Sequence, residues 1–324
     1  MNTDFITDRR SLVAGLASMA AFGGAIPAAF AAKPRNMFER LKASVGLQLY
    51  TLGDEPVADL DGTLAKVAAI GYRDLELPQL YGKTPAELKA AADKAGVTFS
   101  SIHLAATPNV PKTALSLLSE PQRIVDDLGA LGVKSAVLPI MLFPPNFKEN
   151  PGENVLAALV RALQEAGADI WKQTANVLNE KAAALQPHGI SVSYHNHNVE
   201  FQPIGKTSGW EILIAETDKK LVGLEVDIGW LGAAGIDPVS FLRRHKGRCR
   251  ALHVKDIQAT TKTNFALSMD PTEVGSGTIN WSRVLPAAKE AGVRHFYVEQ
   301  EPPFKTTRME AAAKSFAYLS QLRG

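Results

Sequence analysis

From residue 44 onward, one pattern of apolar and polar positions returns along the chain. A stretch with helical spacing ends in a glycine, a short apolar segment follows, and a polar loop comes next. Glycine suits the end of a helix because it reaches the left-handed backbone conformation without strain. The apolar segments predict eight β-strands, which begin at Val45, Gly71, Gly96, Gly132, Gly189, Val222, Gly247 and Gly292.

Strands that alternate with helices predict a parallel sheet with right-handed crossovers. Eight such units over about 280 residues fit a closed (β/α)8 barrel. The alternative is a doubly wound open sheet, which normally carries a glycine-rich phosphate loop after its first strand. The segment LQLYTLGDEP at the end of the first predicted strand contains no such loop. We therefore expect an α/β fold with a single TIM-barrel domain over residues 32–324.

Polar and ionisable side chains stand at the ends of most predicted strands. The active sites of (β/α)8 barrels lie at the carboxyl ends of the strands. Charged groups there are costly to bury unless they are paired or bind a cation. These strand ends carry, in chain order, Gln48, Glu76, His103, His195 with His197, Asp227, His253 with Lys255, and Glu299 with Glu301.

One divalent metal ion is the simplest single explanation for His195, Asp227, His253 and Glu299. Mixed nitrogen and oxygen ligands suit transition metals better than Ca²⁺. The candidate ions are Mn²⁺, Co²⁺, Fe²⁺, Zn²⁺ and Mg²⁺. Each position also has an alternative: His195 as a hydrogen-bonded core histidine, or Asp227 in a structural ion pair with Lys255.

The overall charge and the cysteine content exclude several classes of protein. Thirty-five basic and 33 acidic residues give a net charge of +2, with no long run of either sign. A nucleic-acid-binding protein would show a basic patch or stripe. The single cysteine, Cys249, excludes an intrachain disulfide and a cysteine-rich zinc site.

The first 31 residues have the layout of an export signal. Arg9-Arg10 precedes an apolar run rich in Ala and Gly, which ends in the A-x-A pattern of Ala29 to Ala31. The paired arginines indicate the twin-arginine route. We therefore predict a signal peptide over residues 1–31 and a periplasmic protein. No other segment approaches the roughly 20 apolar residues of a membrane span.

Seven segments together resemble a known family. They are GLQLYTL, GYRDLEL, YHNHNVEF, LEVDIGWLGAAGIDP, ALHVKD, VGSGTINWSRVLPAAKEAGV and YVEQE, in order over nearly all of residues 44–320. The chain resembles the xylose isomerase-like TIM-barrel superfamily, and within it the sugar phosphate isomerase/epimerase family. The resemblance implies a divalent metal held by an acid after strand five, an Asp after strand six, a His after strand seven and a Glu after strand eight. Asp227, His253 and Glu299 match the last three positions.

Two positions depart from the family pattern. Many relatives read Glu-Asn-His where this chain has His195, Asn196 and His197, so a histidine stands at the expected ligand and acid/base glutamate. Imidazole can ligate or move a proton, but a ligating nitrogen is not free to act as a base. We expect His195 to ligate the metal and His197 to face the substrate. Trp230 replaces a histidine of the DNA-repair members, which argues against nucleic acid and offers a flat face to a sugar, although packing at the barrel rim is the alternative.

The resemblance implies an enzyme acting on a sugar or keto-sugar. A divalent metal would acidify the C–H beside a carbonyl and stabilise an enediolate, while Glu299, His195 or His197 moves the proton. Because export disfavours phosphorylated substrates, the first expectation is a periplasmic keto-sugar isomerase or epimerase. A lyase or dehydratase that acts on a keto-glycoside by β-elimination is second, and a non-catalytic carbohydrate-binding barrel is third. The oligomeric state stays open, a homo-oligomer included. The expected substrate contacts are Gln48, Glu76, His103, His197, Trp230 and Lys255.

Overall fold

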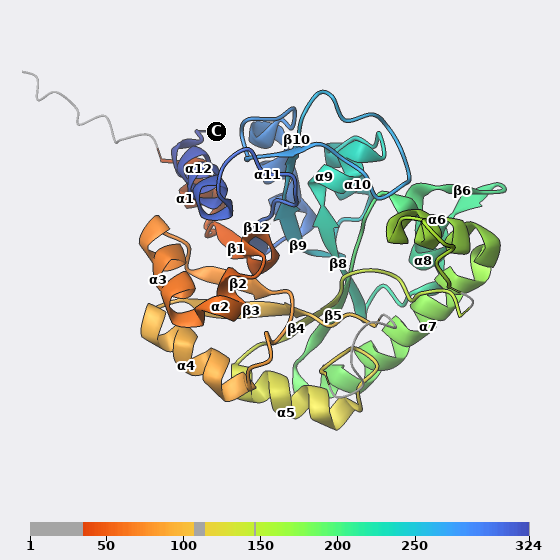
Figure 1. Cartoon of the computed structure of the whole chain (residues 1–324), viewed down its shortest axis with the longest axis horizontal. Coiled ribbons are helices and arrows are strands. Elements are labelled where there is room, and N and C mark those ends of the chain that lie inside the picture. The colour runs from red at the N-terminus through yellow and green to blue at the C-terminus, as the bar shows by residue number, and fades with distance from the viewer. Residues whose placement is uncertain (1–34, 107–113, 146, 324) are drawn as a thin grey trace, which may run out of the picture. The chain divides into compact units, whose positions relative to one another are not determined.

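The computed structural model describes residues 35–106, 114–145 and 147–323, so the predicted signal peptide lies outside the described residues. Within them, eight parallel strands close into a barrel (Figure 1), which confirms the predicted (β/α)8 fold. The order around the barrel is β1, β12, β9, β8, β5, β4, β3, β2. The strands are β1 (Gly46–Gln48), β2 (Asp74–Leu77), β3 (Thr98–His103), β4 (Ser135–Leu138), β5 (Ser191–His195), β8 (Val222–Asp227), β9 (Cys249–Val254) and β12 (His295–Val298).

Helices lie around the outside of the barrel (Figure 1). Their starts follow capping rules: Thr84 accepts a hydrogen bond from the Glu87 N–H, and the Glu87 carboxylate returns to the Thr84 N–H. No helix of the described residues is both long enough and apolar enough for a bilayer. The α-helices are α1 (Met37–Leu41), α2 (Glu55–Ala58), α3 (Leu60–Ile70), α4 (Pro85–Ala95), α5 (Pro121–Leu131), α6 (Val155–Ala166), α7 (Ala168–Leu185), α8 (Gly209–Glu216), α9 (Ile228–Ala233), α10 (Pro238–Arg244), α11 (Trp281–Ala291) and α12 (Arg308–Gln321).

Short elements connect the barrel to its loops. Two small antiparallel ladders pair β6 (Pro203–Ile204) with β7 (Thr207–Ser208), and β10 (Asp256–Ile257) with β11 (Pro271–Thr272). Single 3₁₀ turns are formed by Leu49–Leu52, Gln186–His188 and Val199–Phe201.

The strands alternate between an apolar outer face and a polar inner face. Val222, Leu224 and Val226 of β8 are buried among the apolar residues of the core, while Glu225 and Asp227 belong to the opposite face. The apolar core therefore lies between the strands and the helices. The barrel interior is where the polar side chains gather.

The barrel register brings particular polar residues side by side. Glu225 lies opposite His195, and Asp227 lies opposite His253. The register shifts at two places, between Leu75 and Glu76 and between Leu224 and Glu225. Such irregularities re-aim side chains. Both shifts fall directly before a buried glutamate of the barrel interior.

Candidate metal centre

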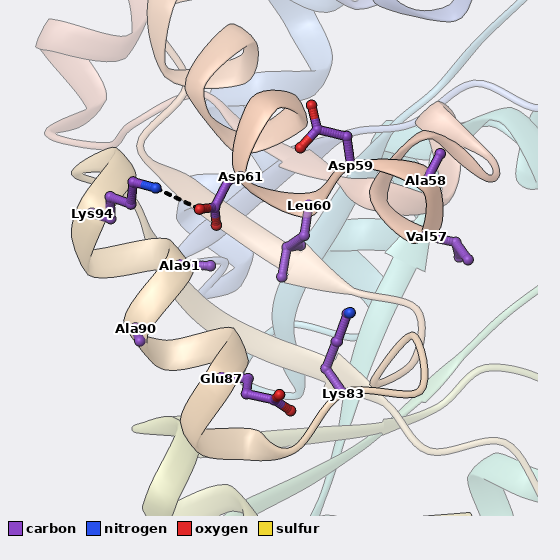
Figure 2. Close-up of a pocket in the computed structure, with 10 residues that line it drawn as sticks. All are labelled: Val57, Ala58, Asp59, Leu60, Asp61, Lys83, Glu87, Ala90, Ala91 and Lys94. Carbon is purple, nitrogen blue, oxygen red and sulfur yellow. Dashed lines mark hydrogen bonds and ion pairs between the residues drawn. The ribbon is translucent and has the colours of Figure 1, made fainter.

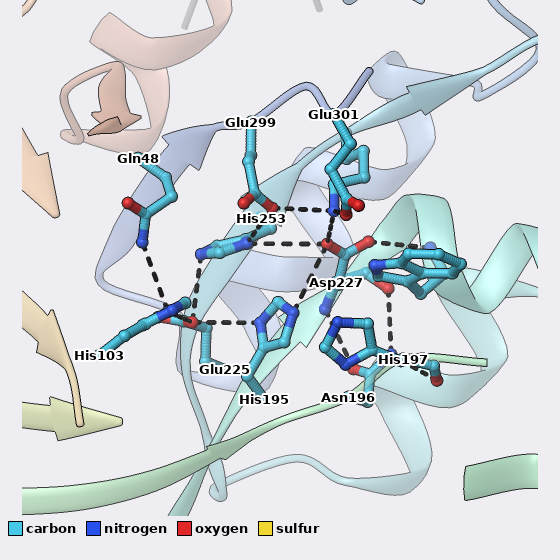
Figure 3. A network of polar contacts seen from close by, with 12 residues as sticks. Gln48, His103, His195, Asn196, His197, Glu225, Asp227, His253, Glu299 and Glu301 are labelled. Atoms are coloured by element: carbon cyan, nitrogen blue, oxygen red, sulfur yellow. Dashed lines mark hydrogen bonds and ion pairs between the residues drawn. The ribbon is translucent and has the colours of Figure 1, made fainter. Parts of the chain in front are cut away.

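Figure 3 shows histidines and carboxylates from several strands converging at the carboxyl end of the barrel. Two groups of side chains have ligand atoms close enough together to share one ion. The first, which we call the inner set, is His103, His195, Glu225 and His253. The second, the outer set, is Asp227, His253 and Glu299.

The inner set surrounds one carboxylate oxygen. Glu225 Oε1 lies 2.9 Å from His103 Nε2, 3.2 Å from His195 Nδ1 and 3.1 Å from His253 Nε2. Three of the four residues are at most 3% exposed, and the His103 side chain is 10% exposed. The donors come from β3, β5, β8 and β9; β5, β8 and β9 are neighbours in the sheet, whereas β4 lies between β3 and β5.

A second buried glutamate lies beside the inner set. Glu76 Oε2 is 2.7 Å from His253 Nε2 and 3.3 Å from His103 Nε2. The amide of Gln48 donates to the same oxygen at 2.8 Å. Gln48 and Glu76 were predicted to contact substrate; both are fully buried, Gln48 beside His103 and Glu76 beside His103 and His253.

The outer set encloses a lysine. Lys255 Nζ lies 2.9 Å from Asp227 Oδ2, 2.8 Å from Glu299 Oε2 and 2.6 Å from Glu301 Oε1. His253 Nδ1 is 2.8 Å from the same Glu299 oxygen. The ion pair between Asp227 and Lys255, one of the sequence alternatives, is therefore present in the structure.

Opposing effects set the charge states of the histidines. Burial opposes protonation of His103, but the charges and hydrogen bonds of Glu76 and Glu225 raise its pKa to about 9. Burial likewise opposes protonation of His253, yet Glu225 and Glu299 raise its pKa well above the ordinary value. Burial and the neighbouring imidazoles hold the pKa of His195 well below its usual range. His195 is therefore a neutral imidazole, the form that binds metals.

Glu299 and Lys255 stabilise each other's charged forms. Burial alone would raise the pKa of Glu299, but Lys255 and His253 lower it. Burial also disfavours the ammonium form of Lys255, and Asp227, Glu299 and Glu301 overcome this and raise its pKa. A buried charge is tolerated when it is paired and hydrogen-bonded in this way.

The residues of the site fit a divalent metal ion. Imidazoles and carboxylates together suit zinc and other transition metals. Glu76 Oε1 and Glu225 Oε2 are buried and accept no hydrogen bond within the described part of the chain. Unsatisfied buried carboxylate oxygens are costly, and a bound cation would satisfy them.

The four ligands predicted from the sequence lie next to one another but divide between the two sets. His195 Nε2 is 3.9 Å from Asp227 Oδ2, and His253 belongs to both sets. Sequence reasoning missed Glu225. Its signal was its spacing, because residues two apart in a strand share a face and Glu225 precedes Asp227 by two.

A cavity of about 280 Å³ opens above the centre at the barrel mouth. A neighbouring cavity of about 700 Å³ shares Pro78 and His103 with it. Trp230 and Lys255, two further predicted substrate contacts, are buried and are not part of the lining. The ionisable residues that line the smaller cavity are Tyr50, His103, His195, His197, Glu299 and Glu301.

His197 and Trp230 pack together at one side of the centre. Their ring centroids are 5.1 Å apart, and the backbone N–H of Trp230 donates to Asp227 Oδ1 at 2.8 Å. His197 Nδ1 has no hydrogen-bond partner among the described residues. His197 is therefore a histidine of the cavity wall that lies outside both donor sets.

A separate groove of about 520 Å³ lies between α3 and α4 (Figure 2). The described residues that line it include no histidine. Its ion pair between Asp61 and Lys94 is solvent-exposed, and such pairs contribute little. The groove therefore offers neither the donors nor the burial of the barrel mouth.

Buried histidines and carboxylates at the carboxyl ends of the strands occupy the position where (β/α)8 barrel enzymes have their active sites. Residues 64–322 match the family model described as Xylose isomerase-like TIM barrel. The chain belongs to this family.

Curated relatives are similar at low identity. An inosose dehydratase of Clostridium beijerinckii is 26% identical over 167 residues, which cover 48% of this chain and 55% of the relative. The chain thus aligns with about half the length of that relative. An inosose dehydratase of Clostridium botulinum is 22% identical over 311 residues, covering 88% of this chain and 99% of the relative.

Solved structures share the barrel. A sugar phosphate isomerase/epimerase of Parabacteroides distasonis superposes with a TM-score of 0.66 and 25% identity, over 85% of this chain and 93% of that one. A xylose isomerase-like TIM barrel protein of Mycobacterium smegmatis, solved in complex with magnesium, has a TM-score of 0.57 and 16% identity over 86% and 96% of the two chains. The latter likeness concerns the fold alone.

Proposed function

We propose that this protein is a metal-dependent enzyme that removes a proton beside the carbonyl of a keto-sugar and returns it, as an isomerase or epimerase does. The observation that carries the proposal is the buried cluster of imidazoles and carboxylates directly beneath a cavity at the barrel mouth. Buried donors of this kind with an open cavity above them are the arrangement of catalytic metal sites rather than structural ones. Membership of the xylose isomerase-like family supports the same chemistry.

The donors around His253 would hold the ion. When bound, a divalent metal supplies a Lewis acid that polarises a carbonyl oxygen and acidifies the neighbouring C–H. Lys255 has a complementary role in the protein itself. Its ammonium forms ion pairs with Asp227 and Glu299 and lowers the pKa of the Glu299 carboxyl, which lines the cavity.

Glu299 and His197 are the proposed proton carriers. Glu299 follows β12 and His197 follows β5, and β9 and β8 lie between these two strands in the barrel. A substrate in the cavity would therefore have a carboxylate on one side and an imidazole on the other. A proton taken on one side and returned from the other inverts the carbon, and return to the adjacent carbon isomerises the sugar.

The cavity favours an uncharged carbohydrate. A volume of about 280 Å³ is at the lower end of the range for small-molecule sites. No arginine is among the described residues that line it, whereas phosphate sites commonly use arginine. The adjoining cavity of about 700 Å³ leaves room for a substituent on the sugar.

Elimination is the second candidate, favoured by the two curated relatives named inosose dehydratase. The first step is the same: the C–H bond beside the carbonyl breaks and its proton passes to a base of the site. The C–O bond at the next carbon then breaks, and the leaving water or alcohol takes a proton. The product is an unsaturated ketone in place of an isomer.

Export is a separate proposal, supported by Arg9-Arg10 and the A-x-A pattern of residues 29–31. Cell fractionation should find the protein in the periplasm and its Arg9→Lys, Arg10→Lys double variant in the cytoplasm. Periplasmic recovery of the double variant would contradict the twin-arginine route.

Solvent deuterium exchange tests the enzymatic proposal. The mature protein, loaded with Mn²⁺, Co²⁺ or Zn²⁺, is incubated in D₂O with keto-glucosides and a keto-inositol, and products are followed by NMR. We expect deuterium at the carbon beside the carbonyl and about 100-fold slower incorporation for His197→Gln and Glu299→Gln. Glu290→Gln, an exposed change on α11, is the matched control.

The reaction product distinguishes isomerisation or epimerisation from elimination. An epimer or isomer supports the first proposal, and an unsaturated ketone with strong ultraviolet absorbance supports elimination. Substrate binding without any deuterium incorporation would overturn both and favour a binding protein.

A further inference from the structure

We propose that the divalent ion binds the inner set, through His103, His195, Glu225 and His253 Nε2, and that Lys255 is the resident cation of the outer set. The inference rests on the proposed metal dependence and specifies which donors serve it. It departs from the ligand set that the sequence predicts, because Asp227 and Glu299 become partners of a lysine rather than of the metal.

The first step of the argument is that the outer set already contains a cation. Lys255 Nζ lies within 2.6 to 2.9 Å of three carboxylates, and its side chain is 1% exposed. The protein is built around it: a Cβ at Gly229 would come within 2.7 Å of Lys255 Cγ. The Trp230 ring, with its centroid 5.3 Å from Nζ, covers the ammonium. A divalent ion among the same oxygens would be strongly repelled by this ammonium.

The second step is that the inner set contains no lysine or arginine, and its imidazoles can release their protons when a metal ion binds. In the described part of the chain, the side chains that hydrogen-bond to Glu76 and Glu225 are imidazoles and the Gln48 amide. Glu76 Oε1 and Glu225 Oε2 have no partner there and are buried. Two unsatisfied carboxylate oxygens beside three imidazoles form a ready ligand set for a transition metal.

The third step concerns the two faces of His253. Its Nε2 faces the inner set, and its Nδ1 lies 2.8 Å from Glu299 Oε2. A metal-ligating histidine typically donates its other ring N–H to a carboxylate, which fixes the ring and its tautomer. Glu299 is placed to accept this hydrogen bond, and Lys255 forms an ion pair with the same Glu299 oxygen. Glu299 and Lys255 of the outer set thereby fix the orientation of the His253 ring toward the inner set.

The test counts imidazoles around the metal. The intact mature protein is loaded with zinc, and X-ray absorption fine structure measures the number of imidazole ligands, while metal analysis gives the stoichiometry. We expect one zinc per chain with three imidazoles. The outer set alone would give one imidazole, and the predicted combination of His195, Asp227, His253 and Glu299 would give two.

Matched variants give a second readout. Glu225→Gln should lose bound zinc under conditions where Asp227→Asn and Lys255→Met retain it, and Glu299→Gln should weaken binding by about 10- to 100-fold through His253. One or two imidazoles, or zinc loss from Asp227→Asn but not Glu225→Gln, would overturn the inference while leaving metal dependence intact. A wild-type protein that takes up no zinc, cobalt or manganese would overturn this inference and the metal-dependent function together.

Discussion

Gly229 has no side chain, and this leaves space for the aliphatic carbons of Lys255. A Cβ there would lie 2.7 Å from Lys255 Cγ and 2.9 Å from Cδ, and these atoms are held by the three ion pairs at the end of the side chain. We predict that Gly229→Ala destabilises the protein by about 1–3 kcal/mol, since the crowding exceeds the gain in helix propensity. Urea unfolding measures the change.

Gly129 on α5 is the matched control. A Cβ at this position would project into open space, with no atom of a neighbouring element within 4 Å. Gly129→Ala should therefore raise the free energy of unfolding by about 0.5–1 kcal/mol. Equal destabilisation by both substitutions would show that the Lys255 contact is not the cause.

At the scale of elements, Asn196 joins the ends of β5 and β8. Its Oδ1 accepts from the Asp227 N–H at 3.0 Å, and its Nδ2 donates to the Asp227 carbonyl at 3.3 Å. Asn196→Asp replaces the donor by an oxygen that faces a carbonyl. We predict a loss of about 2–3 kcal/mol in unfolding free energy, and weaker metal binding because β8 also carries Glu225.

Asn198, two residues further, provides the control for this effect. Its Nδ2 donates to Asn264, and its Oδ1 accepts from the Leu267 N–H at 3.1 Å, so it fixes a loop rather than the two strands. Asn198→Asp should destabilise the protein without changing metal affinity. Unchanged metal affinity in Asn196→Asp would refute the role of the strand connection.

The opposite end of the barrel has a pH-sensitive contact between β12 and β2. His295 Nδ1 lies 2.8 Å from Asp74 Oδ2, and this hydrogen bond raises the pKa of His295 against the effect of burial. Folding raises the pKa of His295 above its value of about 6.5 in the unfolded chain. The contact with Asp74 therefore adds its full stability below about pH 6.5, and this stability is lost as the pH rises through the folded-state pKa. We predict that wild type exceeds His295→Gln in stability by less than about 1 kcal/mol, and only on the acid side.

Urea unfolding of both proteins from pH 5 to pH 9 measures this difference. When both proteins also carry Asp74→Asn, the difference in unfolding free energy between His295 and His295→Gln should be the same at every pH. A difference that grows with pH would contradict the assignment of the contact.

The strands could be predicted from the sequence because each is a short apolar segment and most follow a glycine at the end of a helix, as at Gly96 and Gly132. The sequence also predicted that His195, Asp227, His253 and Glu299 lie close together, because each stands at the carboxyl end of a strand. Their division into two sets could not be predicted. It depends on the register shift before Glu225, in the pairing of β8 with β9, and on which ring nitrogen of His253 faces which carboxylate. Neither leaves a signal in the pattern of apolar and polar residues.

At the scale of the whole molecule, a bound ion would link four strands of the barrel. The inner set takes donors from β3, β5, β8 and β9, which come from separate parts of the chain. Unfolding disperses these donors, so an ion that binds only the folded barrel stabilises it by about 2.7 kcal/mol at 100 times its Kd. We therefore predict that the zinc-loaded protein melts about 5 °C or more above the chelator-treated protein. Calorimetry of wild type and Glu225→Gln measures this: the variant should show no zinc-dependent shift, and a chelator that leaves the wild-type Tm unchanged would contradict a metal bound across these strands.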